Sequence, residues 1–150
     1  MTHREIPPPI LFFICFVAGA VAQARYPLFL GIPSFRLALV LSSVILVVAA
    51  AIGAWAILEM KKFRAPIEPG SVPVHLVVTG PFRFTRNPLY LTLLLVLVAL
   101  AVMADSVWLI ASVVPLFVLL QGVVRREESR LDRAFGKPYE AYRARVRRWV

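Results

Sequence analysis

Residues 87–124 decide the fold of this chain. They read NPLYLTLLLVLVALAVMA (87–104), then Asp105, then SVWLIASVVPLFVLLQGVV (106–124). Apart from Asp105 the stretch has no charged side chain, and each half has 18 or more residues, about the length that a helix needs to cross roughly 30 Å of hydrocarbon. The stretch therefore predicts two membrane helices joined as a tight hairpin with its tip at residues 104–106. Pro115 lies inside the second helix, where a proline can introduce a kink.

Two more uncharged stretches precede the hairpin, at residues 6–24 and 37–58. The three prolines at positions 7–9 are expected to start the first helix rather than lie within it. Because further apolar runs follow, the first run indicates a membrane anchor rather than a signal peptide. The pattern predicts an all-α integral membrane protein, a single membrane domain over residues 1–150 with about four transmembrane helices.

The composition supports this class of protein. The chain is 60% hydrophobic and 17% charged, whereas an average soluble domain is about 45–50% apolar and about 25% charged. A cytosolic enzyme, a disordered tail and a secreted disulfide scaffold are all disfavoured. Cys15 is the single cysteine, and His3 and His75 are the two histidines, so we expect no disulfide within the chain and no metal site. The net charge of +9 then indicates loops beside anionic lipid rather than a nucleic-acid partner.

The basic residues predict the orientation. Five Lys or Arg residues lie in residues 59–86, nine lie in residues 125–150, and the hairpin tip has none. The positive-inside rule makes 59–86 a cytoplasmic loop and 125–150 a cytoplasmic tail. Four spans place the N-terminus, with Arg4, on the same side. The expected location is a bacterial inner membrane with both termini in the cytoplasm.

The unusual sequence begins in the loop, with LVVTGPFRFTRNPLY at residues 76–90. Gly80 and Pro81 predict a turn. Asn87 predicts a helix N-cap, with Pro88 at the first helical position. Such a helix start can simply be capped, or it can hold a carboxylate or phosphate on its free N–H groups. Arg83 and Arg86 would add to the positive field there, or would reach lipid phosphates.

The tail opens with Arg125-Arg126-Glu127-Glu128 where the last span ends. Acidic residues are unfavourable at a helix C-terminus, since its dipole is already negative. Two interpretations remain open: a carboxylate placed to meet a cationic ligand, or a helix that continues into water with a Glu127–Arg130 pair. Beyond Gly136 and Pro138 a second helix is expected, whose apolar face suits a membrane interface. That face is formed by Tyr139, Tyr142, Val146 and Trp149.

Together these segments resemble a known family. The loop at 76–90, the hydrophobic hairpin and the tail pattern REExxLxxxFGxxYxxY (126–142) resemble the isoprenylcysteine carboxyl methyltransferase family, whose relatives include phospholipid N-methyltransferases. The resemblance covers roughly residues 60–150. It implies a membrane methyltransferase in which the loop before the hairpin and the acidic tail hold S-adenosylmethionine at the cytosolic face.

The resemblance also implies site residues. By position, the residues that would bind the cofactor are His75, Leu76, Val77, Phe82, Asn87, Pro88, Tyr90 and Glu127. The eukaryotic carboxyl methyltransferases carry an Arg four residues before the tail Glu, where this chain has Val123. Arg126 is therefore the candidate catalytic residue, as a substrate anchor, with Arg125 as the alternative. The GxG signature of the phospholipid enzymes is replaced by Gly-Pro-Phe at 80–82.

These departures leave the methyl acceptor open. The resemblance implies transfer to a lipophilic acceptor at the membrane–cytosol boundary, with carboxyl O-methylation first and phospholipid or small-amine N-methylation as the alternative. Methyl transfer needs alignment and a dry site more than an acid–base pair. Two other classes remain as alternatives: an NADPH-dependent membrane reductase of the sterol C14 type, and a non-enzymatic small membrane transport or assembly protein. Transport is disfavoured, because the spans carry almost no polar residues at mid-membrane depth. The expected partners are a lipophilic small-molecule substrate and membrane lipids.

Overall fold

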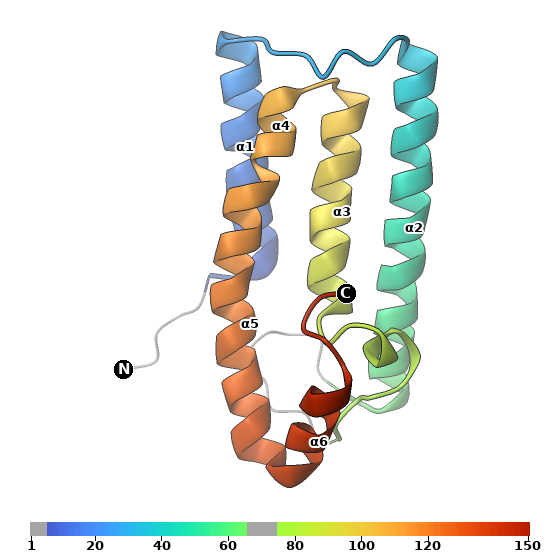
Figure 1. Ribbon diagram of the computed structural model, residues 1–150, viewed down its shortest axis with the longest axis vertical. Coiled ribbons are helices and arrows are strands. Elements are labelled where there is room, and N and C mark those ends of the chain that lie inside the picture. The colour runs from blue at the N-terminus through green and yellow to red at the C-terminus, as the bar shows by residue number, and fades with distance from the viewer. Residues whose placement is uncertain (1–5, 66–74) are drawn as a thin grey trace. The chain divides into compact units, whose positions relative to one another are not determined.

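The computed structural model describes residues 6–65 and 75–150, and these residues form helices joined by short loops. Arg4 and residues 66–74 of the expected loop lie outside the described residues. The elements in chain order are α1 (Pro8–Arg25), α2 (Phe35–Lys62), the 3₁₀ helix η1 (Gly80–Arg83), α3 (Pro88–Met103), α4 (Val107–Ala111), α5 (Val113–Phe135) and α6 (Lys137–Arg145) (Figure 1). The prediction of an all-α membrane protein is confirmed.

Three helical stretches of the described chain are long and apolar enough to cross a membrane: α1, α2 and the stretch Val107–Phe135 that contains α4 and α5. The fourth apolar helix, α3, has 16 residues. At 1.5 Å per residue it rises about 24 Å, less than the roughly 30 Å of a bilayer core. Helices α2 and α5 both extend beyond the apolar runs that predicted them, to Lys62 and Phe135. The loop after α2 therefore begins later than expected, and the tail begins as a continuation of α5.

The hairpin tip lies where the sequence predicts it. Asp105 separates α3 from α4 and has a φ of 47°, a left-handed conformation that Asp tolerates better than most residues. Its side-chain Oδ1 accepts a hydrogen bond of 3.1 Å from the backbone N–H of Ile32. Its carbonyl accepts a second one, of 3.2 Å, from Leu30. The same residue therefore reverses the chain and holds the loop between α1 and α2.

The last apolar span, in which Pro115 was expected to introduce a kink, is interrupted at Ser112, between α4 and α5. A proline has no N–H to donate to the carbonyl four residues earlier, which here belongs to Ala111. Nearby, the backbone N–H and the hydroxyl of Ser112 both donate to the carbonyl of Trp108, at 3.0 and 2.8 Å. The helix is thus interrupted where the missing donor leaves it weakest.

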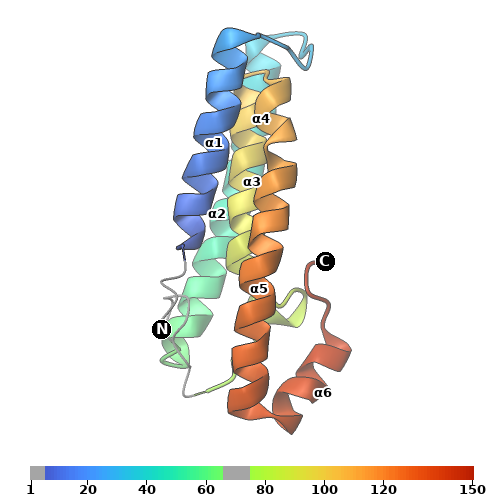
Figure 2. The same ribbon diagram turned by 90° about the vertical axis from the view of Figure 1, so that its left-hand side faces the viewer.

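The described chain divides into two compact units. The first comprises the residues up to Ala49 together with Leu93–Gln121. In it α1 packs against α4 (Figures 1 and 2). Gly19 permits this close approach, since a Cβ at that position would collide with the Ser112 hydroxyl. Large apolar side chains such as Phe13 remain exposed on its surface, as lipid contact requires.

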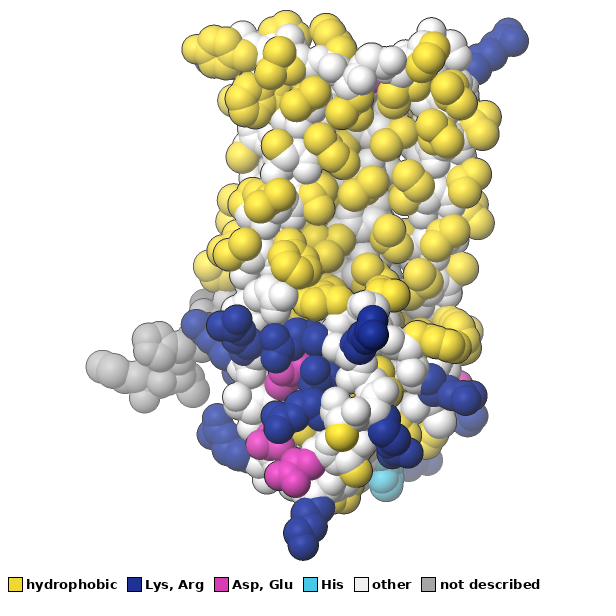
Figure 3. Space-filling model, in the orientation of Figure 1, with side chains coloured by type: hydrophobic (Ala, Val, Ile, Leu, Met, Phe, Trp, Pro, Cys, Tyr) yellow, Lys and Arg dark blue, Asp and Glu magenta, His cyan; other side chains and the backbone are white. Residues whose placement is uncertain are grey.

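The second unit comprises Ala50–Thr92 and Gly122–Val150. On the face shown in Figure 3, hydrophobic side chains cover the helices of the first unit, whereas Lys, Arg, Asp and Glu side chains gather over the second. All of the sequence-predicted site residues belong to this second unit.

Candidate active site

Two stretches that are far apart in the sequence meet in the second unit. The hydroxyl of Tyr90, in the first turn of α3, donates a hydrogen bond of 2.8 Å to Oε2 of Glu127 on α5. Pro88 starts α3 as predicted, and its fixed φ favours a helix start at this point, which places Tyr90 two residues into the helix. The two residues on which the expected site depends are therefore in contact. Their roles as cofactor-binding residues stay a prediction.

The next residue, Glu128, is buried and lies in an ion cluster. Its side chain is 10% exposed. Its Oε1 lies 2.9 Å from Nη1 of Arg86, and its two oxygens accept bonds of 3.0 and 2.7 Å from Nε and Nη2 of Arg148. This bidentate geometry is the strong form of an Arg–carboxylate pair. Consecutive helical side chains point about 100° apart, so Glu127 contacts α3 while Glu128 contacts Arg86, before α3, and Arg148, after α6.

Sequence reasoning missed this cluster. It assigned Arg86 to the field at the start of α3 or to lipid phosphates, and it treated Arg148 as one basic residue among many. The signal for Glu128 was its position beside an apolar run, where an unpaired carboxylate would be costly. That signal indicates that a partner is needed, but it does not identify Arg86 and Arg148.

The tail is also held by backbone carbonyls. The side-chain amide of Asn87 donates to the carbonyl of Arg148 at 2.9 Å, and the hydroxyl of Thr85 donates to the same carbonyl at 3.2 Å. The N–H of Arg86 donates to the carbonyl of Arg147 at 3.1 Å. Asn87 thus precedes the first residue of α3, as predicted, but its amide binds the tail 61 positions away.

The tyrosines of α6 face the protein. Tyr139 and Tyr142 are buried, and the hydroxyl of Tyr142 donates to the carbonyl of Phe82 at 2.7 Å. Burial raises the pKa of both phenols, and the negative charge of Glu128 raises the pKa of Tyr139 further. The sequence suggested these two side chains for the membrane interface. Instead both are buried, and Tyr142 holds the loop that carries Phe82.

A second support holds the other end of this loop. The hydroxyl of Thr79 donates to Oε2 of Glu59 on α2 at 2.9 Å. Gly80 follows with a φ of 61°, and a Cβ there would collide with the side chain of Glu59 and come close to Trp55. Only a glycine fits this position without strain, so the loop lies directly against α2.

The remaining predicted residues differ in exposure. Val77 and Pro88 are buried, Leu76 and Phe82 are half-buried, and His75 and Arg126 are exposed. Among the described residues, no hydrogen bond or ion pair joins Arg126 to the Tyr90–Glu127 contact. In the part of the chain that the structure describes, no group of three or more His, Cys, Asp and Glu side chains could hold a metal ion.

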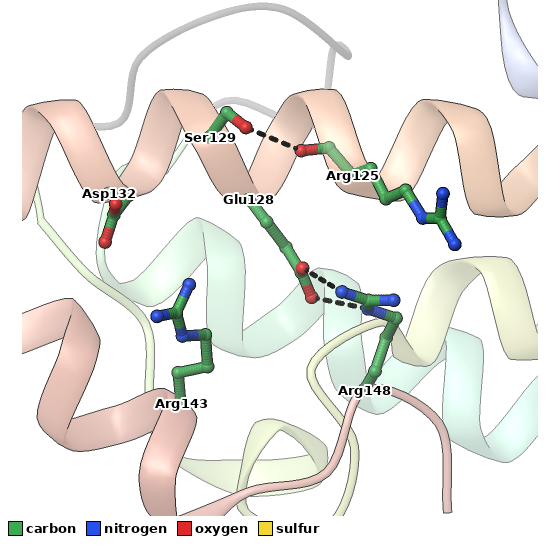
Figure 4. Close-up of a pocket in the computed structure, with 6 residues that line it drawn as sticks. All are labelled: Arg125, Glu128, Ser129, Asp132, Arg143 and Arg148. Carbon is green, nitrogen blue, oxygen red and sulfur yellow. Dashed lines mark hydrogen bonds and ion pairs between the residues drawn. The ribbon is translucent and has the colours of Figure 1, made fainter.

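A polar pocket of about 200 Å³ lies between α5, α6 and the C-terminal segment after α6. Its lining residues are Arg125, Glu128, Ser129, Asp132, Arg143 and Arg148 (Figure 4). None of the residues predicted to bind the cofactor lines it.

Comparison with known proteins identifies the same kind of protein as the motifs do. A family model described as phospholipid methyltransferase matches residues 35–138, and this family covers isoprenylcysteine carboxyl methyltransferase-like proteins. A relative from Haemophilus influenzae, described as an uncharacterized protein, is 35% identical over 63 residues, which are 41% of this chain and 100% of the relative. No solved structure matches the chain. The resemblance inferred from the loop and tail motifs is confirmed.

Proposed function

Since this chain belongs to the phospholipid methyltransferase family, and is therefore a membrane methyltransferase, we propose that it transfers the methyl group of S-adenosylmethionine to a lipophilic acceptor at the membrane–cytosol boundary. The acceptor atom that we propose is a carboxylate oxygen. The observation that carries the proposal is the Tyr90–Glu127 hydrogen bond, because it joins the loop and the tail into one site.

The residues present fit this cofactor. S-adenosylmethionine carries an ammonium, a sulfonium and a carboxylate, and when bound it supplies an electrophilic methyl group. The carboxylate of Glu127, oriented by the Tyr90 hydroxyl, offers a negative charge to a cationic group. The N–H groups in the first turn of α3 offer a positive field to a carboxylate. Leu76, Val77 and Phe82 would supply the apolar wall beside them.

The loop and tail contacts would keep this site aligned. Glu59 holds the loop at Thr79, and Tyr142 holds it at Phe82. Good alignment of reacting groups can contribute roughly 7–11 kcal/mol to a displacement reaction. A carboxylate acceptor needs no general base, so the chain has to bind and orient it rather than deprotonate it. Exposed Arg126 is the proposed anchor for that carboxylate, with Arg125 as the alternative.

The location follows from charge. Nine of the basic residues lie in 125–150, in the unit that holds the site. The positive-inside rule then places this unit and both termini in the cytoplasm. The matched relative from a bacterium supports a bacterial inner membrane as the location.

The direct test is transfer of a labelled methyl group. Membranes with and without the protein are incubated with methyl-labelled S-adenosylmethionine, and the lipid-soluble product is treated with base. Label released as methanol identifies a methyl ester and supports carboxyl O-methylation. Label that resists base overturns the carboxylate assignment and favours the N-methylation alternative.

Matched variants connect the activity to the site. Glu127→Gln should lower the transfer rate at limiting cofactor, whereas Glu140→Gln, an exposed glutamate on α6, should not. Equal rates for the two variants would remove Glu127 from the site. Protein that binds NADPH but not S-adenosylmethionine would favour the reductase alternative, and protein that binds neither would favour a non-enzymatic role.

A further inference from the structure

We propose that the polar pocket between α5, α6 and the C-terminal segment after α6 binds a phosphate group with an attached hydroxyl that can donate a hydrogen bond. The headgroup of an anionic glycerophospholipid has this chemistry. The proposal is independent of the cofactor site, since none of the predicted cofactor residues lines this pocket. Arg125, the alternative anchor for the methyl acceptor, does line it, so Arg143 is the arginine that separates the two sites. It concerns a second ligand of the protein, not the methyl acceptor.

The charge of the pocket favours an anion. Three arginines line it against two acidic residues. One of the two carboxylates, that of Glu128, already pairs with two guanidinium groups. These belong to Arg148, which lines the pocket, and to Arg86, which lies outside the lining at 2.9 Å from Glu128. With Arg86 counted, four guanidinium groups face two carboxylates, which leaves a net charge of +2. A phosphodiester carries one negative charge and would reduce this excess.

Two guanidinium groups are available to a ligand. Within the described residues, neither Arg125 nor Arg143 has a salt bridge, and both line the pocket. Figure 4 shows the side chain of Arg143 extending from α6 toward α5, beside the pair formed by Glu128 and Arg148. Guanidinium groups match phosphate oxygens in geometry as well as in charge. The pocket volume of about 200 Å³ admits a phosphate group with a small attached alcohol.

Asp132 indicates that the ligand also donates a hydrogen bond. It lines the pocket, and its Oδ1 is buried without a hydrogen-bond partner among the described residues. A buried acceptor without a partner is costly. A hydroxyl on the ligand would satisfy it, whereas a bare trimethylammonium headgroup would not. Asp132 therefore favours a phosphoglycerol group over phosphocholine.

The position of Arg125 favours a lipid as the source of the phosphate. It directly follows Val124, the last residue of the uncharged run 106–124. A basic residue that ends an apolar span lies at the depth of lipid phosphates, and basic pockets at this depth bind anionic headgroups. Free inorganic phosphate shares the same chemistry, including a P–OH donor, so the experiment separates the two sources.

The test is a titration of the purified full-length protein with three probes. These are short-chain phosphatidylglycerol, short-chain phosphatidylcholine and inorganic phosphate, each below the concentration at which the lipids form micelles. Binding is followed by calorimetry and by native mass spectrometry. We expect phosphatidylglycerol to bind at least ten-fold more tightly than phosphatidylcholine. Equal affinity for the two lipids would overturn the proposal.

Variants assign the binding to this pocket. Arg143→Gln should weaken phosphatidylglycerol binding at least ten-fold, and Arg147→Gln removes the same charge from an exposed side chain outside the lining and should leave binding unchanged. Arg125→Gln, on the α5 side, is a second variant with the same expected loss as Arg143→Gln. Equal affinity in all three variants would overturn the proposal.

The remaining outcomes are also informative. Phosphate that binds as tightly as phosphatidylglycerol, competes with it and is lost in Arg143→Gln supports the pocket and assigns free phosphate as the ligand. Loss of methyl transfer in Glu127→Gln with unchanged phosphatidylglycerol binding would confirm that the two sites are separate. Failure of the methyl-transfer assay leaves this test unaffected, because it measures lipid binding alone.

Discussion

Glu128 and Arg148 are joined by two hydrogen bonds, of 3.0 and 2.7 Å, although the arginine follows the last helix and the glutamate lies on α5. Arg86 completes the cluster from the segment before α3. One buried carboxylate on α5 therefore joins this helix to the segment before α3 and to the C-terminal segment after α6. Its neighbour Glu127 contacts Tyr90 on α3 from the same helix.

Replacing Glu128 should destabilise the protein strongly. Glu128→Ala would leave two guanidinium groups without their carboxylate, and breaking a buried pair in this way typically costs about 3–5 kcal/mol. Because the Arg148 side chain is 33% exposed, we expect about 2–3 kcal/mol here. Chemical unfolding in a mild detergent measures the loss. The control is Glu140→Ala, and equal losses in the two variants would show that the cluster does not support the fold.

Replacing Glu127 should affect the cofactor more than the fold. Glu127→Gln keeps an oxygen that can accept from Tyr90 but removes the negative charge, and a hydrogen bond to a charged group is worth about 1.5–3 kcal/mol. We expect S-adenosylmethionine affinity to fall by roughly 10- to 100-fold, with little change in unfolding free energy. Calorimetric titration measures the affinity. Unchanged affinity would exclude the carboxylate from the cofactor site.

Two glycines with similar φ angles should respond differently to alanine. Gly80 and Gly136 have φ values of 61° and 55°, which disfavour alanine at both positions. Only at Gly80 would the new Cβ also collide with a neighbouring side chain, that of Glu59. Gly80→Ala should therefore be more destabilising than Gly136→Ala, as thermal unfolding would show. A larger effect at Gly136 would contradict the close contact of the loop with α2.

Alkaline pH should destabilise the second unit. Burial raises the pKa of Tyr139 and of Tyr142 above the ordinary value of 10.0. A group whose pKa is higher in the folded state contributes stability below its unfolded pKa and loses it as the pH rises further. Stability should therefore be constant with respect to these groups below about pH 9 and fall above about pH 10.

The variant Tyr142→Phe separates this effect from general alkaline unfolding. It removes the hydrogen bond to the Phe82 carbonyl, which should cost about 1 kcal/mol at neutral pH. It also removes one of the two titrating groups, so its stability should fall less steeply than that of the wild type above pH 10. Thermal unfolding between pH 7 and 11 measures both effects. Parallel curves would contradict the assignment of the alkaline loss to Tyr142.

The proposed orientation predicts which residues a membrane-impermeant thiol reagent reaches. In a Cys15→Ser background, Glu140→Cys should be labelled only when the cytoplasmic face is accessible, because the basic tail is expected there. Leu28→Cys, in the exposed loop after α1, should be labelled from the opposite side. Labelling of intact cells distinguishes the two, and the reverse pattern would invert the proposed topology.

The helices and their breaks were determined by local sequence. An uncharged run of membrane length, an aspartate at residue 105 and a proline at residue 88 each act within a few residues, so the hairpin, its tip and the start of α3 could be predicted. The family could also be identified from sequence, since the loop motif and the tail motif are each a continuous stretch of the chain.

Only the tertiary structure decided how the polar side chains pair. Glu127 and Glu128 are adjacent and chemically identical, and the sequence contains no signal that one contacts Tyr90 while the other binds Arg86 and Arg148. Their division depends on the rotation of about 100° between successive helical residues and on which segments pack against each side of α5. That packing joins residues 20 to 63 positions apart, and neither hydrophobicity nor charge along the chain encodes such pairings.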